Sequence, residues 1–150
     1  MALDVPAADD ALITTFGRLV EAYSGLERQL GGILQERCGI PHSWFELMLR
    51  ISRSEDARIP MSVLAEQVAL TTGGVTRIFD RMVAAGYAER VPCATDRRVV
   101  FAVLTPAGRT KLDEATAVHT GNLREVFAGF SPTQRRQLDR MLDRLRQVEL

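Results

Sequence analysis

The sequence predicts a mainly α-helical fold with a small β-wing, on the strength of three patterns. Apolar residues recur every three or four positions near both ends of the 150-residue chain, which is typical of amphipathic helices. In the middle, two shorter helical patterns meet at a tight turn, and the second ends at Gly86. Two strand-like runs, at 87–91 and 99–104, then flank an arginine-rich tip. Together these patterns predict a winged helix-turn-helix domain with further helices on its N- and C-terminal sides.

The N-terminal region, about residues 8–38, is predicted to form one long helix. Its apolar stripe recurs at helical spacing and comprises Ile13, Phe16, Val20, Tyr23, Leu26, Leu30 and Ile33. The stripe stops near Cys38 and Gly39, and a glycine often ends a helix because it adopts a positive φ without steric strain. A shorter helix is expected to begin at Pro41, since proline is favoured in the first helical turn.

The helix-turn-helix is predicted within the central unit, about residues 41–105. Its first helix starts near Ser62, and its second helix carries an apolar stripe from Val75 to Val83. Thr71 is expected to cap the second helix, because its hydroxyl can accept a backbone N–H from two or three residues further on. The polar side of the second helix then faces away from the core.

This second helix is predicted to be a recognition helix, whose N-terminal part enters the major groove of DNA. Thr72, Thr76 and Arg77 lie where such a helix meets base edges, and an arginine can bind guanine O6 and N7. Gly73 has no side chain, so the backbone N–H groups there can approach a phosphate closely. The alternative is a surface helix on which Arg77 and Arg81 pair with a neighbouring carboxylate or with water.

The tip of the wing, residues 92–98, is too polar for a core and ends in two arginines. An arginine on a projecting hairpin suits the minor groove, where the negative potential rises as the groove narrows. Asp96 is expected to hold either Arg97 or Arg98 in position. The alternative is a solvated turn that contains only a local aspartate–arginine pair.

A set of short motifs runs through this stretch and covers about a third of the chain. The motifs are Gly74-Val75-Thr76-Arg77, Asp80-Arg81-Met82, Ala85-Gly86-Tyr87, Arg90, Asp96-Arg97-Arg98 and Leu104-Thr105-Pro106-Ala107-Gly108. Their order and spacing resemble the multiple-antibiotic-resistance regulator (MarR) family. The resemblance implies a homodimeric winged-helix repressor or activator that binds a palindromic operator. In that family a small phenolic or other aromatic ligand often releases the DNA, and the wing arginine corresponds to Arg97 or Arg98.

The expected DNA-binding set combines the residue patterns with this resemblance. It comprises Thr71, Thr72, Gly73, Thr76, Arg77, Arg81, Arg90, Asp96, Arg97 and Arg98. The segment 71–110 holds six arginines and three acidic residues, a net charge of +3, although the whole chain is neutral. A local basic face controls attraction to DNA, whereas the neutral total predicts weak non-specific binding.

The C-terminal region, residues 106–150, is predicted to form two more helices. Thr105 and Pro106 begin the first of them, and Ser131 with Gln134 predicts a capping box for the second. Their apolar stripes are too exposed beside a small winged domain, so with the N-terminal helix they are expected to form a dimerisation region. A dimer also places two recognition helices about 34 Å apart. The alternative is a bundle packed within one chain.

An effector site is expected where these helices meet the winged domain, the position of inducers in the family. Its predicted residues are aromatic, polar or flexible and come from several helices: Tyr23, His42, Trp44, Met48 and His119. An aromatic-lined pocket with a few polar groups suits a planar aromatic acid or phenol. The alternative is that Trp44 and Met48 only fill the core.

The composition is that of an ordinary globular chain, with 46% apolar and 25% charged residues. No apolar run approaches the ~20 residues of a membrane span, and no signal peptide is evident, so a cytoplasmic protein is expected. Neither catalysis nor a cofactor is expected, because the two histidines are far apart in the sequence and there is no phosphate-binding glycine loop. No metal site is expected either, since His119 has Leu123 where a second ligand one turn later would stand.

Cys38 and Cys93 raise a redox-sensing hypothesis, because some members of the family sense peroxides through cysteine. Cys93 lies close in sequence to Arg90 and Arg97, and positive neighbours lower the pKa of a thiol. An intrachain bridge is not expected, and two plain reduced thiols are the simpler interpretation. The alternatives to a ligand-released repressor are thus a redox-sensing regulator and a helical interaction module of the same fold without DNA binding.

Overall fold

The computed structural model describes residues 10–68 and 72–149, and it confirms the predicted mainly helical fold with a small wing. In chain order its elements are α1 (Ala11–Cys38), α2 (His42–Arg53), the 3-10 turn η1 (Glu55–Ala57), β1 (Arg58–Pro60), α3 (Met61–Gln67), α4 (Thr72–Ala84), β2 (Ala88–Pro92), β3 (Val100–Leu104), α5 (Pro106–Val126) and α6 (Pro132–Leu145). The predicted cap Thr71 lies outside the described residues.

The predicted helix ends are confirmed where the structure describes them. Gly39 ends α1 with φ 70° and Gly86 follows α4 with φ 80°, both in the left-handed region that glycine tolerates. The Thr105 hydroxyl accepts a backbone N–H of α5 at 3.0 Å. Ser131 and Gln134 form the predicted capping box at the start of α6. Local side-chain chemistry therefore fixes where these helices begin and end.

The sheet has three antiparallel strands in the order β1-β3-β2, one more than the sequence predicted. In the hairpin, Ala88 pairs with Leu104, and on the other side of β3, Ile59 pairs with Ala102. The strand that the sequence did not predict, β1, has only three residues and includes Pro60, so it is too short to show an alternation of apolar and polar residues. It pairs with β3, which lies much later in the chain.

The core is centred on the winged unit, defined here as α2 through β3, and it extends to α1 and α5 through Leu34 and Ala115. Within the winged unit the most completely buried side chains are Phe45, Leu47, Met48, Ile51, Leu64, Val75, Phe79, Met82 and Ala102. The start of α5 packs closely against this unit, because a Cβ on Gly108 would lie 1.9 Å from the Tyr87 carbonyl oxygen. Glycine is therefore required where α5 begins.

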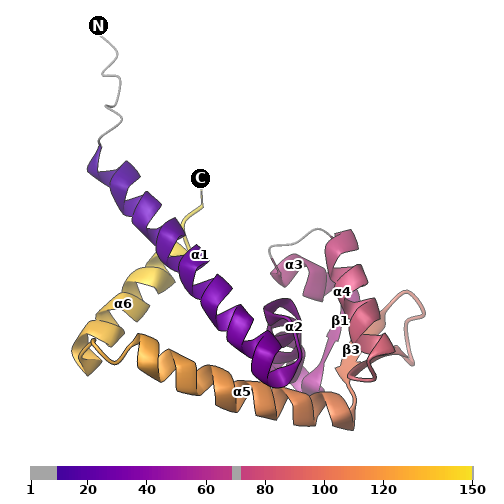
Figure 1. The fold of residues 1–150 in the computed structure, drawn as a ribbon. Helices are drawn as coiled ribbons and strands as arrows, with labels where there is room; N and C mark the ends of the chain where they lie inside the picture. The colour runs from indigo at the N-terminus through magenta and orange to yellow at the C-terminus, as the bar shows by residue number, and fades with distance from the viewer. Residues whose placement is uncertain (1–9, 69–71, 150) are drawn as a thin grey trace, which may run out of the picture.

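The terminal helices α1, α5 and α6 extend away from the winged unit (Figure 1). The C-terminal part of α1 is anchored to the unit through the buried residues Leu30, Leu34 and Cys38. The N-terminal part is not, since Leu12 is 79% exposed and Phe16 67%. On α6 a similar apolar stripe of Met141, Leu142 and Leu145 is exposed, and so is Val148 just beyond the helix. One chain thus leaves a long apolar surface uncovered.

Candidate nucleic-acid interface

Helix α4 divides into a buried face and an exposed polar face. Val75 and Phe79 are completely buried, whereas Thr76, Arg77 and Arg81 are exposed. The backbone of Thr72 and Gly73 begins the helix, and the surroundings of these two residues lie outside what the structure describes. The predicted amphipathic recognition helix is therefore present, with three predicted DNA-binding side chains at its surface.

The tip of the wing is held together by Asp96. Its carboxylate accepts hydrogen bonds from Arg98 Nε and Nη2, both at 3.1 Å, and from the Arg98 backbone N–H at 3.0 Å. The donation from the Arg98 guanidinium lowers the pKa of the Asp96 carboxyl. The expectation that Asp96 positions one arginine is confirmed, and that arginine is Arg98. Arg97 lies beside it and is exposed.

Arg90 connects the wing to the recognition helix. From β2 its guanidinium donates to the Asp80 carboxylate on α4 at 2.7 Å, and it lies over the Phe79 ring, 5.0 Å from the centroid. Through these contacts Arg90 positions β2 against α4. Its predicted contact with DNA stays a prediction. The sequence offered no sign of this pair, because the two partners lie on different elements.

The winged unit and its surroundings match known proteins. Residues 39–99 match the model of the MarR family. The chain is 31% identical over 75 residues to YkoM, an uncharacterized HTH-type transcriptional regulator of Bacillus subtilis, which covers 50% of this chain and 49% of YkoM. It is 28% identical over 115 residues to the transcriptional repressor MprA of Escherichia coli K12, which covers 74% of this chain and 65% of MprA. The chain thus spans between about half and two thirds of these relatives.

The whole fold is similar to that of Sco3205, a MarR family transcriptional regulator from Streptomyces coelicolor whose crystal structure is a complex with DNA. The TM-score is 0.84 at 27% identity, over 97% of this chain and 92% of Sco3205. Residues 39–99 thus match the MarR family of transcriptional regulators, and the whole fold is similar to that of a member of this family. The resemblance that the motifs predicted is thereby confirmed.

Only part of the predicted effector site is brought together in the structure. Tyr23 and His42 line one cavity of about 350 Å³, and the His119 ring lies 6.0 Å from the His42 ring. Trp44 instead packs edge-on against Tyr87, with 6.2 Å between the ring centroids, and Met48 is completely buried. For Trp44 and Met48, the structure matches the alternative of core packing.

The cavity at Tyr23 and His42 also contains residues that the sequence analysis did not name. Glu27 from α1 and Glu46 from α2 lie 4.0 Å and 3.8 Å from the His42 ring nitrogens, and Arg50 lies one turn further along α2. Burial lowers the pKa of His119, and electrostatic repulsion by the nearby His42 lowers it further. No periodic pattern singles out Arg50, because charged residues on a helix usually face solvent.

Cys38 and Cys93 are unbridged and lie in different environments. Burial raises the pKa of Cys38. The pKa of Cys93 is lowered, first by the Thr95 hydroxyl, whose oxygen lies 3.4 Å from the Cys93 sulfur, and then by backbone N–H groups. The predicted direction for Cys93 is confirmed, but the cause is hydrogen bonding and not the neighbouring arginines.

Within residues 10–68 and 72–149, no group of three or more histidine, cysteine, aspartate or glutamate residues is arranged to hold a metal ion. Across the same residues, the helices lack the combined length and apolarity that crossing a membrane requires.

Proposed function

We propose that this MarR-family chain is a homodimeric transcriptional repressor that binds a palindromic operator and acts in the cytoplasm. It is a regulator and not an enzyme. The relatives support the proposal, because MprA is named a transcriptional repressor and Sco3205 was crystallised with DNA. The observation on this chain that carries the proposal is the tip of the wing, where Asp96 fixes Arg98 beside an exposed Arg97.

In this proposal two parts of each winged unit contact the DNA. The N-terminal part of α4 enters the major groove, where Arg77 reads a base edge and Thr76 contacts a thymine methyl or a phosphate. The wing reaches the adjacent minor groove with its two arginines. The Asp80–Arg90 pair keeps these parts at a constant separation, because it joins α4 to β2 through a 2.7 Å ion pair.

The terminal helices supply the dimer. The proposed division assigns residues of about 41–105 to the winged domain and those of about 8–38 and 106–150 to dimerisation. Support comes from the uncovered apolar stripes of α1 and α6, which a second copy would remove from water. Such a dimer presents two recognition helices to two half-sites about 34 Å apart.

Release from DNA is assigned to a small aromatic ligand at the junction of α1 and α2. The cavity of about 350 Å³ at Tyr23 and His42 supports this assignment, since it offers a phenol ring, an imidazole and an adjacent arginine. The ligand favours a dimer whose recognition helices are wrongly spaced for the operator. A thermal-shift screen of phenols and aromatic acids would identify it.

The central test is a gel shift with the DNA that lies upstream of the protein's own gene. We expect specific binding that weakens strongly when Arg97 and Arg98 are both changed to alanine. The slope of log affinity against log salt should fall by about one for each phosphate that the variant no longer neutralises. The matched control removes two exposed arginines from the terminal helices, Arg124→Ala with Arg135→Ala, and should retain operator affinity.

Two results would count against this assignment. If the folded variant with Arg97 and Arg98 changed to alanine binds the operator as tightly as the wild type, the wing does not contact the DNA. Failure of the wild type to bind any duplex, even at low salt, would favour the helical interaction module without DNA binding.

A further inference from the structure

Arg50 on α2 carries a buried polar atom that none of the described residues satisfies. Its Nε is shielded from solvent and has no hydrogen-bond partner among residues 10–68 and 72–149. Among the residues that the structure describes, no carboxylate forms an ion pair with its guanidinium. A buried cationic donor without an acceptor is unfavourable, so a ligand that brings an acceptor to this place gains affinity from it.

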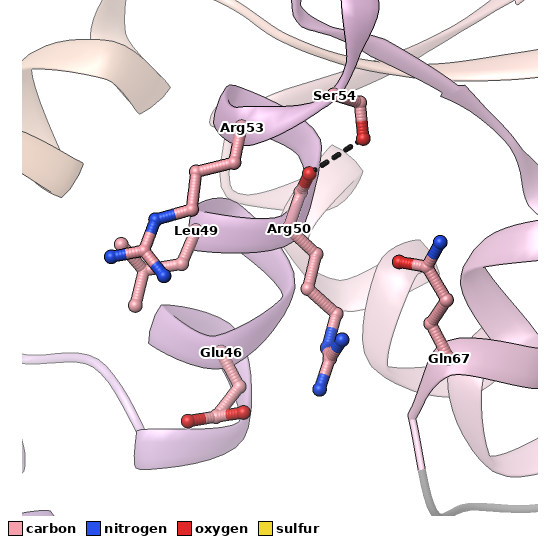
Figure 2. A pocket seen from close by; sticks show the side chains of 6 residues that line it. All are labelled: Glu46, Leu49, Arg50, Arg53, Ser54 and Gln67. Carbon is pink, nitrogen blue, oxygen red and sulfur yellow. Dashed lines mark hydrogen bonds between the residues drawn. The ribbon is translucent and has the colours of Figure 1, made fainter. Parts of the chain in front are cut away.

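A cavity of about 530 Å³ lies beside this guanidinium, between α2 and the end of α3. Its walls are formed by Glu46, Leu49, Arg50, Arg53, Ser54 and Gln67. Figure 2 shows Arg50 reaching toward the side of α2 where Gln67 lies, whereas Arg53 extends on the other side. Arg50 and Glu46 also line the cavity at Tyr23 and His42, so the two cavities are neighbours.

The chemistry of the walls suits a small anion. Arg50 offers a planar fork of N–H donors, and Gln67 offers an amide across the cavity. The single acidic wall residue, Glu46, lies 3.8 Å from the His42 ring and forms no ion pair with Arg50. The volume lies within the range of small-molecule sites, and Leu49 adds an apolar wall.

We propose that Arg50 binds the carboxylate of a small organic acid between α2 and α3, with Gln67 as the second contact. A carboxylate is favoured because it pairs with a guanidinium through two parallel hydrogen bonds. This inference rests on the proposed release of the operator by a small ligand. It adds a site beside the cavity at Tyr23 and His42, and it specifies the charge of the ligand there and the residue that recognises it.

The site lies at the end of the helix that precedes the predicted recognition helix α4. Gln67 is the last residue of α3, and α4 begins five positions later, at Thr72. A ligand held by both Arg50 and Gln67 favours one arrangement of α3 relative to α2, and α3 supports the recognition helix. Binding therefore shifts the population away from the arrangement that fits the operator.

The experiment compares benzoate with benzamide, a neutral molecule of nearly the same shape. We expect benzoate to stabilise the full-length protein saturably in a thermal-shift titration and to release the operator over the same concentrations, while benzamide does neither. Arg50→Met should weaken benzoate binding at least about tenfold, the usual scale for a charged hydrogen bond. Arg53→Met is the matched control, because it removes a charge from the same cavity, and it should change the affinity by less than about threefold.

Several outcomes would overturn the inference. These are equal binding of benzamide, unchanged benzoate affinity in Arg50→Met, or no saturable binding of benzoate by the wild type. Inorganic phosphate serves as a third probe, and Arg50-dependent binding of phosphate without benzoate would replace the carboxylate by a phosphate ligand. Should Arg50→Met not fold, Arg50→Lys keeps the charge but removes the planar fork, and it should still weaken benzoate binding.

The same measurements separate this inference from the proposed function. If the wild type binds benzoate through Arg50 but binds no operator, the proposed regulatory function is refuted and the carboxylate site at Arg50 is supported. A wild type that binds its operator but shows no benzoate response refutes only the site.

Discussion

The winged unit and the terminal helices use similar apolar residues in opposite ways. In the winged unit, Phe45 and Phe79 are at most 2% exposed and belong to one continuous core. On the terminal helices, Phe16 is 67% exposed and Leu145 is 56% exposed. Since burial of apolar surface is the dominant stabilising force in folding, one chain is enough to form this core, to which α1 and α5 also contribute Leu34 and Ala115. The N-terminal part of α1 and the apolar stripe of α6 are buried only when something covers them.

The polar contacts differ between the winged unit and α6 in the same way. In the winged unit the Asp80–Arg90 pair joins two elements, and Arg90 also lies over a buried ring. At the end of α6 the ion pair between Asp143 and Arg146 joins residues only three positions apart, so it does not fix this helix relative to any other. The arrangement of α6 therefore depends on its apolar face, whereas α5 is also joined to α1, where Lys111 Nζ donates to the Cys38 carbonyl at 3.1 Å.

The sharpest test of the comparison is the same substitution in both regions. Phe79→Ala should lower the free energy of unfolding by about 3–5 kcal/mol, because it leaves a cavity in a closed core. Phe16→Ala removes a side chain that is 67% exposed in one chain, so its cost should depend on protein concentration, as for a group buried between subunits. Denaturant melts at two concentrations measure both effects. Equal, concentration-independent losses would contradict the distinction.

A charge placed on the apolar stripe of α6 should break the dimer without unfolding the winged unit. Leu142→Asp buries an unpaired carboxylate in the proposed dimer interface, and the dissociation constant of the dimer should rise at least about tenfold. Arg140→Asp, an exposed site on the polar side of the same helix, controls for the effect of aspartate on helix stability. Sedimentation velocity measures the dimer, and circular dichroism the fold. A wild type that is a monomer at micromolar concentration would refute the dimer itself.

The smallest expected effect concerns His119, at the junction of the two regions. Burial lowers its pKa in the folded state from the ordinary value of 6.5. Below about pH 6.5 the unfolded chain therefore binds more protons than the folded one, and stability falls as the pH falls. We expect this loss to be the smallest of the three effects, because His119 is partly exposed to solvent.

The check is the pH dependence of the unfolding midpoint in the wild type and in His119→Phe. Phenylalanine keeps an aromatic ring against Phe45, which lies 4.9 Å from the His119 ring. The variant should lose the part of the slope between pH 7 and pH 5 that comes from this imidazole. A slope that is the same in both proteins would show that His119 titrates in the folded state as it does in the unfolded chain.

Sequence patterns predicted the parts of the fold that depend on neighbouring residues. Gly39, Thr105 and the Ser131–Gln134 capping box mark helix ends through contacts within four residues, and all were predicted correctly. The short strand β1 was missed, since its only evidence is its pairing with β3. For the candidate interface, the Asp96–Arg98 contact was foreseen because its partners are two residues apart. The Asp80–Arg90 contact was not, because its partners lie on separate elements.

By itself, the sequence determined the family, the order of the elements and the polar face of the recognition helix, because periodicity, caps and motifs are local properties. Only the tertiary structure decided which of the candidate effector residues face a cavity. It placed Met48 in the core and Trp44 against Tyr87, and it brought Arg50 to a cavity beside Gln67. Periodicity shows which face of a helix is apolar. It does not show where two packed helices leave space, since that depends on the shapes of side chains from distant parts of the chain.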